Sequence, residues 1–519
     1  MRKSEITTTP EGDTVIERNE ADITMGSPKQ QVSWPLICSV ASSVLGSLQI
    51  GYHIGNMNAP QKVIEDFFNE TWAFRYEKPV PLPILSVLWS LTVSILALGA
   101  TAAVLSVSLF ADNLGRRNSI LLTNMLAILS VLLMGFSKMA GSPEMLIIGR
   151  LVIGLYSGLS MALIPLYIQE VSPTALRGAF STMNQLFYTI GIFLGQVMSL
   201  EEMLGTPKHW PLMLSLSVVP AVIQYTSLPF CPESPRYLLI NKNQEYRALR
   251  ALWDLRGTTD VVAEFQEMKE EMLHLHKASK VTCCQLFSVP QYRQPIIIAL
   301  VLAASTQLSG FNAVINFSTE MFTSARIKKP EYFTLGVGMV NIMFTALSVL
   351  LVEKVGRRTL LLVGQMAMVI CTLLLTVTTS QYTEGRWVSC LLVMSIFSFV
   401  AFYELGPGPI TWFITAELFS QSARPVAMGV SGCCNWICKF LVAMIYQPLT
   451  DLIGSYCFLV FAACLFCAFI YTWRNVPETR GRTFEDITLE FSQTEVRQPG
   501  RFYNTPDPLY YGTYENGSL

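Results

Sequence analysis

The sequence predicts an all-α membrane protein with twelve transmembrane helices in two pseudo-symmetric six-helix halves. Of its 519 residues, 51% are hydrophobic and only 14% are charged, whereas a soluble protein carries about 25% charged residues. The apolar residues gather in runs of about 18 or more, the length that a membrane-spanning helix needs. The segment Asp112-Asn-Leu-Gly-Arg-Arg117 recurs as Glu353-Lys-Val-Gly-Arg-Arg358, each time between two apolar runs. This duplication indicates two related halves.

Twelve apolar spans follow one another along the chain. Each can reach across about 30 Å of hydrocarbon at about 1.5 Å per residue. We expect every span to be a helix, because backbone groups in lipid must be satisfied internally and alternating strand patterns are absent. The spans cover residues 35–57, 85–110, 118–137, 144–168, 178–200, 210–230, 294–318, 332–352, 359–380, 387–416, 425–448 and 453–473.

The connections divide the chain into five parts. Residues 1–34 are a polar tail without the apolar core of a signal peptide, and residues 475–519 form a second polar tail. The two six-helix halves cover residues 35–231 and 294–474. Between them, residues 232–293 hold the longest charged interruption, in which two stretches rich in Glu, Lys, Arg and Leu predict a linker of short amphipathic helices on a membrane face.

The distribution of Lys and Arg predicts the orientation, because cytosolic loops carry the excess of these residues. The even-numbered connections hold most of the loop arginines, so we expect both termini in the cytosol. The first loop is then extracellular, and its sequon at Asn69 predicts N-glycosylation. The sequons at Asn316, inside a span, and Asn516, in a cytosolic tail, are expected to stay unmodified. No basic block suggests a nucleic acid, and no metal, cofactor or disulfide framework is predicted.

Charged residues repeat at matched places where spans end. Glu170 precedes Arg177 by seven residues, and Glu417 precedes Arg424 by seven. Carboxylate–guanidinium pairs near water contribute modestly, so two states that break and re-form them lie close in energy. We therefore predict a cytosolic gate, although loop charges that only set topology are the alternative. The gate residues are Asp112, Arg116, Arg117, Glu170, Arg177, Glu233, Arg236, Glu353, Arg357, Arg358, Glu417 and Arg424.

Several motifs together resemble the facilitative glucose transporter family, the sugar-porter branch of the major facilitator superfamily. They are the two Gly-Arg-Arg turns, Pro232-Glu-Ser-Pro-Arg236, Gln307-Leu-Ser-Gly310, Gly406-Pro-Gly-Pro409 and Pro477-Glu-Thr-Arg480. The match runs from about residue 35 to 490. The resemblance implies the major facilitator fold, alternating access and passive flux of a hexose across the plasma membrane, without catalysis or a cofactor.

Polar residues inside the spans predict the substrate site. A hexose presents hydroxyls and an apolar ring face, so its site needs neutral donors and acceptors and an aromatic wall. Amide side chains provide both functions without a buried charge, and the resemblance implies sugar contact at these positions. The alternative is that they only join helices. The predicted substrate-binding residues are Gln185, Gln307, Asn312, Asn341, Trp412 and Asn435, with Trp436 as a second ring face and a helix break at residues 406–409.

Four ionisable residues lie well inside the spans. The resemblance places Arg150 and Glu404 at positions that are commonly charged, which predicts structural networks. His53 stands where proton-coupled sugar porters carry a carboxylate. We favour a neutral, hydrogen-bonded imidazole, although an unperturbed one titrates at about pH 6.5. Lys439 lies one turn after Asn435 on the same helix face, so it faces the predicted cavity unless it pairs with an acid or snorkels outward.

Other departures from the family pattern concern the lining of the predicted site. Thr306 replaces the first amide of a Gln-Gln pair, and Asn316-Phe317 stands where a Tyr-Tyr pair usually forms an outer gate. Together with His53 and Lys439, Thr306 and Asn316 are therefore candidates for substrate selectivity. They leave three alternatives to a glucose carrier open. These are a uniporter for fructose or an organic anion such as urate, a proton-coupled sugar symporter, and a nutrient receptor without flux.

Overall fold

The computed structural model describes residues 33–173, 176–277, 281–380, 386–420 and 423–480. Within these ranges all regular secondary structure is helical, which confirms the predicted fold class. The two tails predicted at residues 1–34 and 475–519 lie almost entirely outside the described residues.

In the first half, the helix boundaries lie close to the boundaries of the predicted spans. The structure divides the second span into α3 and α4 and the sixth into α8 and α9. The helices are α1 (Trp34–Gly55), α3 (Leu82–Val104), α4 (Val107–Leu114), α5 (Arg116–Phe136), α6 (Pro143–Val171), α7 (Arg177–Met198), α8 (Trp210–Ser215) and α9 (Val218–Ser227).

The second half repeats this arrangement with two broken spans. Gly406 separates α17 from α18, which confirms the predicted break at residues 406–409. A second break at Ser309 and Gly310, where Gly310 has a φ of 87°, separates α13 from α14 and was not predicted. The helices are α13 (Pro290–Leu308), α14 (Phe311–Ser324), α15 (Pro330–Val355), α16 (Arg357–Ser380), α17 (Arg386–Leu405), α18 (Pro407–Glu417), α19 (Arg424–Ile453) and α20 (Cys457–Asn475).

Twelve crossings can be counted in the described chain. Ten segments are long and apolar enough to span a membrane, and the last of them, Arg424–Asn475, contains both α19 and α20. The remaining crossing is α7, which packs along α1. Polar residues such as Asn184 and Gln196 make α7 less apolar than its neighbours.

The helix ends follow local sequence signals. Ser33 caps α1 by accepting a hydrogen bond from the Leu36 amide at 3.3 Å, and Ser142 caps α6 in the same way with Met145. Such caps satisfy amides that have no partner within the helix. Proline stands in the first turn of α1, α3, α6, α13, α15, α18 and α19, where its missing N–H costs nothing.

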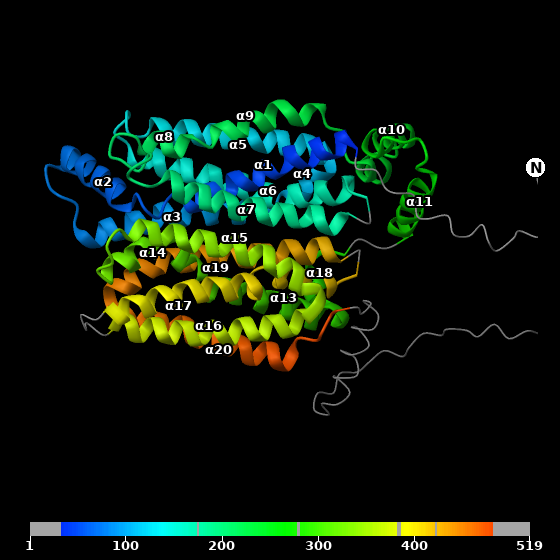
Figure 1. The fold of residues 1–519 in the computed structure, drawn as a ribbon. Helices are drawn as coiled ribbons and strands as arrows, with labels where there is room; N and C mark the ends of the chain where they lie inside the picture. Colours follow the sequence, from blue (N-terminus) through cyan, green and yellow to red (C-terminus); the bar gives the residue numbers. More distant parts are fainter. Residues whose placement is uncertain (1–32, 174–175, 278–280, 381–385, 421–422, 481–519) are drawn as a thin grey trace, which may run out of the picture.

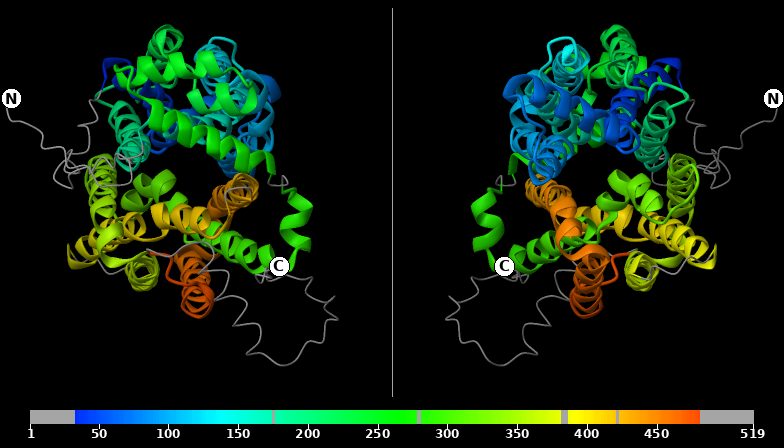
Figure 2. Two further views of the ribbon diagram at one scale, coloured as in Figure 1. Left: turned by 90° about the vertical axis from the view of Figure 1, so that its right-hand side faces the viewer. Right: turned by 90° about the vertical axis from the view of Figure 1, so that its left-hand side faces the viewer.

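The two halves lie side by side, and their helices run between two opposite faces (Figures 1 and 2). They meet mainly where α3 packs on α19 and α7 packs on α15. One end carries α2 (Gln61–Tyr76) and is called the α2 face. The other carries α10 (Glu245–Arg256) and α11 (Val262–Lys277) and is called the linker face. These helices, with α12 (Cys283–Ser288), form where the sequence predicts a helical linker.

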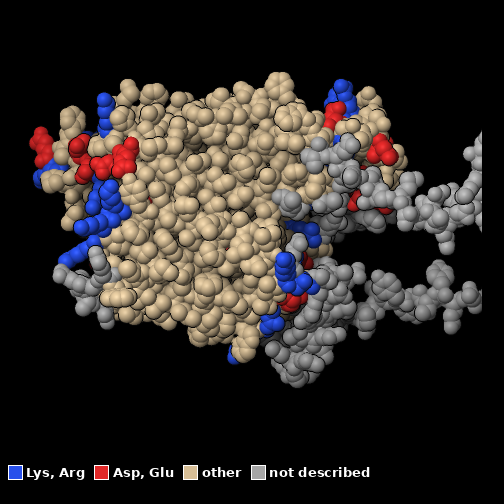
Figure 3. All heavy atoms as spheres, viewed as in Figure 1, with Lys and Arg blue, Asp and Glu red and all other residues tan. Residues whose placement is uncertain are grey.

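On the side of the molecule seen in Figure 3, the surface between the two faces carries no exposed charged side chains. Figure 3 shows the Lys, Arg, Asp and Glu side chains at the two ends of the molecule and an uncharged surface between them. A surface of this kind matches the hydrocarbon layer of a bilayer, because lipid cannot solvate charge. The chain is therefore a multi-pass integral membrane protein.

Candidate functional site

Four polar side chains of the second half form one hydrogen-bonded chain, here called the amide chain. The Gln307 amide donates to Asn435 Oδ1 at 3.2 Å, and the Asn312 amide donates to Gln307 Oε1. Asn435 Nδ2 donates to Thr306 Oγ1 at 2.8 Å. All four residues are buried. They come from α13, α14 and α19, so the break at Gly310 brings residues of three helices together.

This arrangement is suited to a neutral ligand rich in hydroxyl groups. In the amide chain, one amide side chain forms a hydrogen bond with another. A hydroxyl group of a solute can take the place of either amide, because a hydroxyl both donates and accepts a hydrogen bond. The cluster also lies at a break in the helix, and irregular backbone at membrane depth is found where it lines a cavity or packs within protein. The sequence predicted Gln307, Asn312 and Asn435 as substrate residues and Thr306 as a selectivity residue. The structure brings these four together.

The other predicted substrate residues lie apart from the amide chain. Asn341 is buried on α15, where its Oδ1 accepts a hydrogen bond from Thr345 at 3.4 Å, and Thr345 also lies 3.1 Å from Glu404 Oε2. Asn341 Nδ2 has no partner among the described residues. Gln185 on α7 and Trp412 on α18 are both half-buried. Their contact with a solute remains a prediction.

The charged residues within the spans occupy different surroundings. His53 Nε2 lies 2.8 Å from Ser217 Oγ, which agrees with the hydrogen-bonded histidine interpreted from the sequence. The Arg150 guanidinium donates to the carbonyls of His53 and Thr92 at 2.8 and 3.2 Å. These bonds tie α1, α3 and α6 together. Arg150 and His53 therefore belong to one structural network of the first half.

Lys439 does not pair with an acid among the described residues. Its Nζ lies 4.9 Å from the centre of the Trp436 ring, at a distance suited to a cation–π interaction. This contact covers a face of the Trp436 ring, which was predicted to contact the substrate. Lys439 lines a small cavity together with Arg150 and Asn316. It thus faces the interior of the protein and does not snorkel to the surface.

The two Gly-Arg-Arg turns have matching geometry at the linker face. Glu233 Oε1 accepts hydrogen bonds from the Arg116 and Arg117 amides at 3.1 and 3.0 Å. Glu478 does the same for Arg357 and Arg358 at 2.9 and 3.1 Å. The two carboxylates therefore cap α5 and α16, where a negative charge is favourable.

The glycine of each turn is required by this arrangement. Gly115 has a φ of 91° and Gly356 a φ of 106°, a region that other residues rarely adopt. A Cβ at Gly115 would lie 2.6 Å from the Glu233 carboxylate, and a Cβ at Gly356 would lie 2.9 Å from that of Glu478. Glu233 is among the predicted gate charges, whereas Glu478 was not predicted, although both residues follow proline in matching Pro-Glu motifs.

Several of the predicted gate charges form ion pairs within one half or with the linker. Arg116 pairs with Glu170 at 2.9 Å, and Arg357 pairs with Glu417 at 3.3 Å, which is the matching contact of the second half. The Asp112 carboxylate lies 4.0 Å from Arg116. Contact of these charges between the halves, as a closed gate requires, remains a prediction.

The remaining gate charges lie at the same face. Arg236 pairs with Glu271 of α11, and Arg424 donates to the Phe419 carbonyl at 3.4 Å. Arg177 is half-buried at the start of α7. The side chain of Glu353 lies outside the described residues.

The described hydrogen bonds that side chains make between the two halves gather toward the α2 face. Asn58, after α1, donates to the Ile315 carbonyl at 2.7 Å and to Ser318 Oγ at 2.8 Å, and it accepts from the Thr319 amide at 3.1 Å. Ser86 also donates to Asp451 at 2.8 Å. The halves are therefore joined at the α2 face in this structure. This contact was not predicted from the sequence. The signal that could have indicated it is a polar residue, Asn58, directly after the first span.

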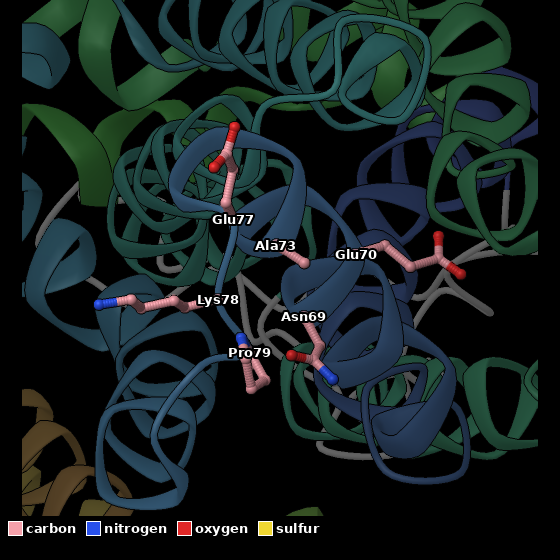
Figure 4. Close-up of a pocket in the computed structure, with 6 residues that line it drawn as sticks. All are labelled: Asn69, Glu70, Ala73, Glu77, Lys78 and Pro79. Carbon is pink, nitrogen blue, oxygen red and sulfur yellow. The ribbon is translucent and has the colours of Figure 1, made fainter.

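The predicted glycosylation site lies on the outside of the α2 face. Asn69 is exposed on α2 and lines a hollow of about 380 Å³ with Glu70, Glu77 and Lys78. Its side chain lies beside Pro79 (Figure 4), and its Oδ1 accepts a hydrogen bond from the Val80 amide at 3.1 Å. Asn316, by contrast, is buried, and Asn516 lies outside the described residues.

Comparison with known proteins agrees with the fold and the motifs. Residues 38–491 match the family model of the sugar (and other) transporters. Facilitated glucose transporter member 1 of Gallus gallus is 50% identical over 475 residues, which cover 92% of this chain and 96% of the relative. Member 3 of Ovis aries is 49% identical over 467 residues, which cover 90% of this chain and 94% of the relative.

A solved structure shares the same fold. The xylose transporter XylE of E. coli in an inward open conformation superimposes with a TM-score of 0.73 at 23% identity and covers 88% of this chain and 99% of its own.

The relatives are transporters and not enzymes. The matches extend over nearly the whole chain at an identity of about one half. The chain therefore belongs to the sugar transporter family, in its facilitated glucose transporter group.

Proposed function

We propose that this protein is a facilitative carrier that moves a hexose down its concentration gradient by alternating access. The observation that carries the proposal is the amide chain of Gln307, Asn312, Asn435 and Thr306, a set of neutral donors and acceptors at a helix break. The close relatives named above are facilitated glucose transporters. A sugar hydroxyl that enters the amide chain replaces one amide partner and keeps the other groups paired.

In the proposed cycle, solute binds between the halves and is released on the opposite side after the halves rock. The contacts of Asn58 and of Ser86 with Asp451 close the α2 face in the present state. Movement to the other state breaks these contacts and brings the charges of the linker face together. Because each contact contributes modestly, the two states differ little in free energy and interconvert.

The proposed orientation places the linker face and both termini in the cytosol. The arginines of the Gly-Arg-Arg turns lie at the linker face, as the positive-inside rule requires. The α2 face is then extracellular, where Asn69 is accessible for glycosylation. We propose the plasma membrane as the location, since a passive hexose carrier supplies a cell by connecting its interior with the external medium.

Tracer uptake into liposomes that contain the purified protein tests the proposal. D-Glucose is expected to enter much faster than L-glucose, to exchange faster when unlabelled D-glucose is present inside, and to stop at equal concentrations. An imposed pH gradient is expected to leave uptake unchanged, which separates a uniporter from a proton-coupled symporter. Absence of flux for a panel of monosaccharides would contradict the proposal.

One observation favours a second candidate function, a uniporter for an organic anion such as urate. Lys439 is a buried basic residue one helical turn after Asn435 of the amide chain, and a cation favours an anionic solute over a neutral one. Labelled urate and fructose belong in the same panel. If Lys439→Asn raises glucose uptake and abolishes urate uptake, the physiological solute is anionic. If it leaves the preference for glucose unchanged, the second candidate is wrong.

A further inference from the structure

Two buried cations from opposite halves face one small cavity. Arg150 of α6 and Lys439 of α19 both line a space of about 10 Å³. The exposed fraction of Lys439 is 8%, and that of Arg150 is 2%. The cavity lies at the contact between α3 and α19, and it holds about one particle the size of a water molecule. It is too small for a hexose.

The described residues provide no negative charge at this place. The Arg150 guanidinium donates to two backbone carbonyls, which are neutral groups. The Lys439 ammonium lies against the Trp436 ring. Lys439 and Arg150 line the same small cavity, so positive charges on the two side chains repel one another. A buried charge without a partner is costly, and two like charges add to that cost.

The other groups around the cavity can bind a small anion. Asn316 of α14 and Ser94 of α3 line the space with Lys439 and Arg150, and their amide and hydroxyl groups are hydrogen-bond donors. Apolar side chains of α1, α3 and α19 complete the wall. A dehydrated ion in such surroundings interacts strongly with cationic groups, because the apolar walls screen the charges poorly.

We infer that this cavity binds a monovalent inorganic anion of the halide class, such as chloride, between Arg150 of the first half and Lys439 of the second. The ion is separate from the transported solute and remains in the protein while the α2 face is closed. It converts the repulsion between two cations into attraction through a shared counter-ion.

The anion site is linked to the conformational state, because each half supplies one cation. When the halves separate at the α2 face, the two cations move apart and the site is lost. An anion that binds only the closed state shifts the equilibrium toward that state. Removal of halide therefore favours opening of the α2 face.

Tryptophan fluorescence of the purified full-length protein tests the inference. Bromide, which is close to chloride in size, is titrated at constant ionic strength against gluconate, which is too large for the cavity. Trp436 lies next to Lys439, so bromide in the site quenches one of nine tryptophans. We expect two components of quenching. One is the linear collisional quenching, and the other is a saturable loss of up to about one-ninth of the fluorescence. Chloride is expected to compete for this saturable component.

Two variants and one control separate the site from general salt effects. Lys439→Gln removes one cation, and Asn316→Asp places a fixed carboxylate beside both cations. Each change is expected to abolish the saturable quenching. Lys439→Gln weakens the attraction of the site for the halide, and in Asn316→Asp the new carboxylate takes the place of the halide. Lys208→Gln, at an exposed lysine of the α2 face, is expected to leave it unchanged.

The outcomes distinguish this inference from the proposed transport function, because fluorescence does not depend on flux. Saturable, chloride-sensitive quenching that is lost in both variants supports the anion site, whatever solute is carried. Purely linear quenching in the unmodified protein overturns it. Saturable quenching that persists in Asn316→Asp also overturns it, and this variant retains Lys439 in case Lys439→Gln fails to fold.

Discussion

The Asn58 side-chain amide of the first half donates a hydrogen bond to Ser318 Oγ of the second half at 2.8 Å. Both residues are buried. The same asparagine also bonds to the backbone at Ile315 and Thr319. One side chain therefore makes three hydrogen bonds to the opposite half, which makes Asn58 a principal contact that closes the α2 face.

Asn58→Ala is expected to open the α2 face. Buried groups that lose their partner cost about 1–3 kcal/mol, and this cost falls on the closed state alone. The reporter is Ser94→Cys at a buried position on α3, in a protein in which the exposed Cys390 is replaced by serine. An impermeant maleimide is expected to label it roughly tenfold faster with Asn58→Ala, in keeping with about 1.4 kcal/mol. Equal labelling rates would show that Asn58 does not hold this face closed.

Glu233→Ala and Glu478→Ala are expected to lower thermal stability to a similar extent. Each removes a carboxylate that accepts two amide hydrogen bonds at the start of a helix, and loss of such a cap costs about 0.5–2 kcal/mol. Thermal unfolding in detergent measures the change. The control is Glu201→Ala, at an exposed glutamate of the α2 face. A stability loss in one variant alone would contradict the equivalence of the two turns.

Gln307→Leu is expected to weaken hexose binding without loss of the fold. The change removes the central member of the amide chain, and each neutral hydrogen bond contributes about 0.5–1.5 kcal/mol. A rise of about tenfold in the KM for D-glucose is therefore expected in liposomes. Gln365→Leu serves as the control, because Gln365 is a buried glutamine of α16 outside the amide chain. Equal KM values for Gln307→Leu and the unmodified protein would remove Gln307 from the site.

External acidification is expected to favour closure of the α2 face through Glu65. Burial raises the pKa of Glu65 in the closed state, and the charge of Glu320 in the opposite half raises it further, while a hydrogen bond from Gln61 lowers it. Asp66 and Lys62 act on Glu65 with opposite signs. Because the pKa is higher when the face is closed, proton uptake stabilises closure as pH falls, and ionisation at higher pH favours opening.

The Ser94→Cys reporter also measures this pH effect. With the intrinsic pH dependence of the maleimide subtracted, its labelling rate is expected to fall as external pH decreases through the raised pKa of Glu65. Glu65→Gln is expected to remove the dependence, and Glu70→Gln, an exposed glutamate on the same helix, is expected to retain it. A dependence that survives Glu65→Gln would assign the proton to another group.

The sequence predicts the fold well because membrane helices have a local signal. An apolar run of sufficient length predicts a crossing without reference to its neighbours, and the break at Gly406 is visible as two glycines and two prolines in four residues. The break at Gly310 depends on one glycine, which helices often tolerate. It was missed for this reason, although it positions Asn312 beside Gln307.

The contacts between the halves could not be predicted in the same way. Asn58 binds partly to backbone groups. Because every residue has these groups, the sequence does not indicate which residues Asn58 meets. Lys439 was identified as facing the interior because it follows Asn435 by one helical turn. Its proximity to Arg150 depends on how α19 packs against the first half. Periodicity assigns a residue to a helix face, but it does not say which helix that face meets.

Distances between spin labels on the two halves test the central claim of alternating access most directly. One pair joins Met203 and Lys328 at the α2 face, and the other joins Asn113 and Thr359 at the linker face; all four are exposed. In liposomes, a shift in the conformational equilibrium with D-glucose is expected to lengthen one distance and shorten the other. If both distances stay constant, or change in the same direction, while glucose flux continues, rocking of the two halves is not the transport mechanism.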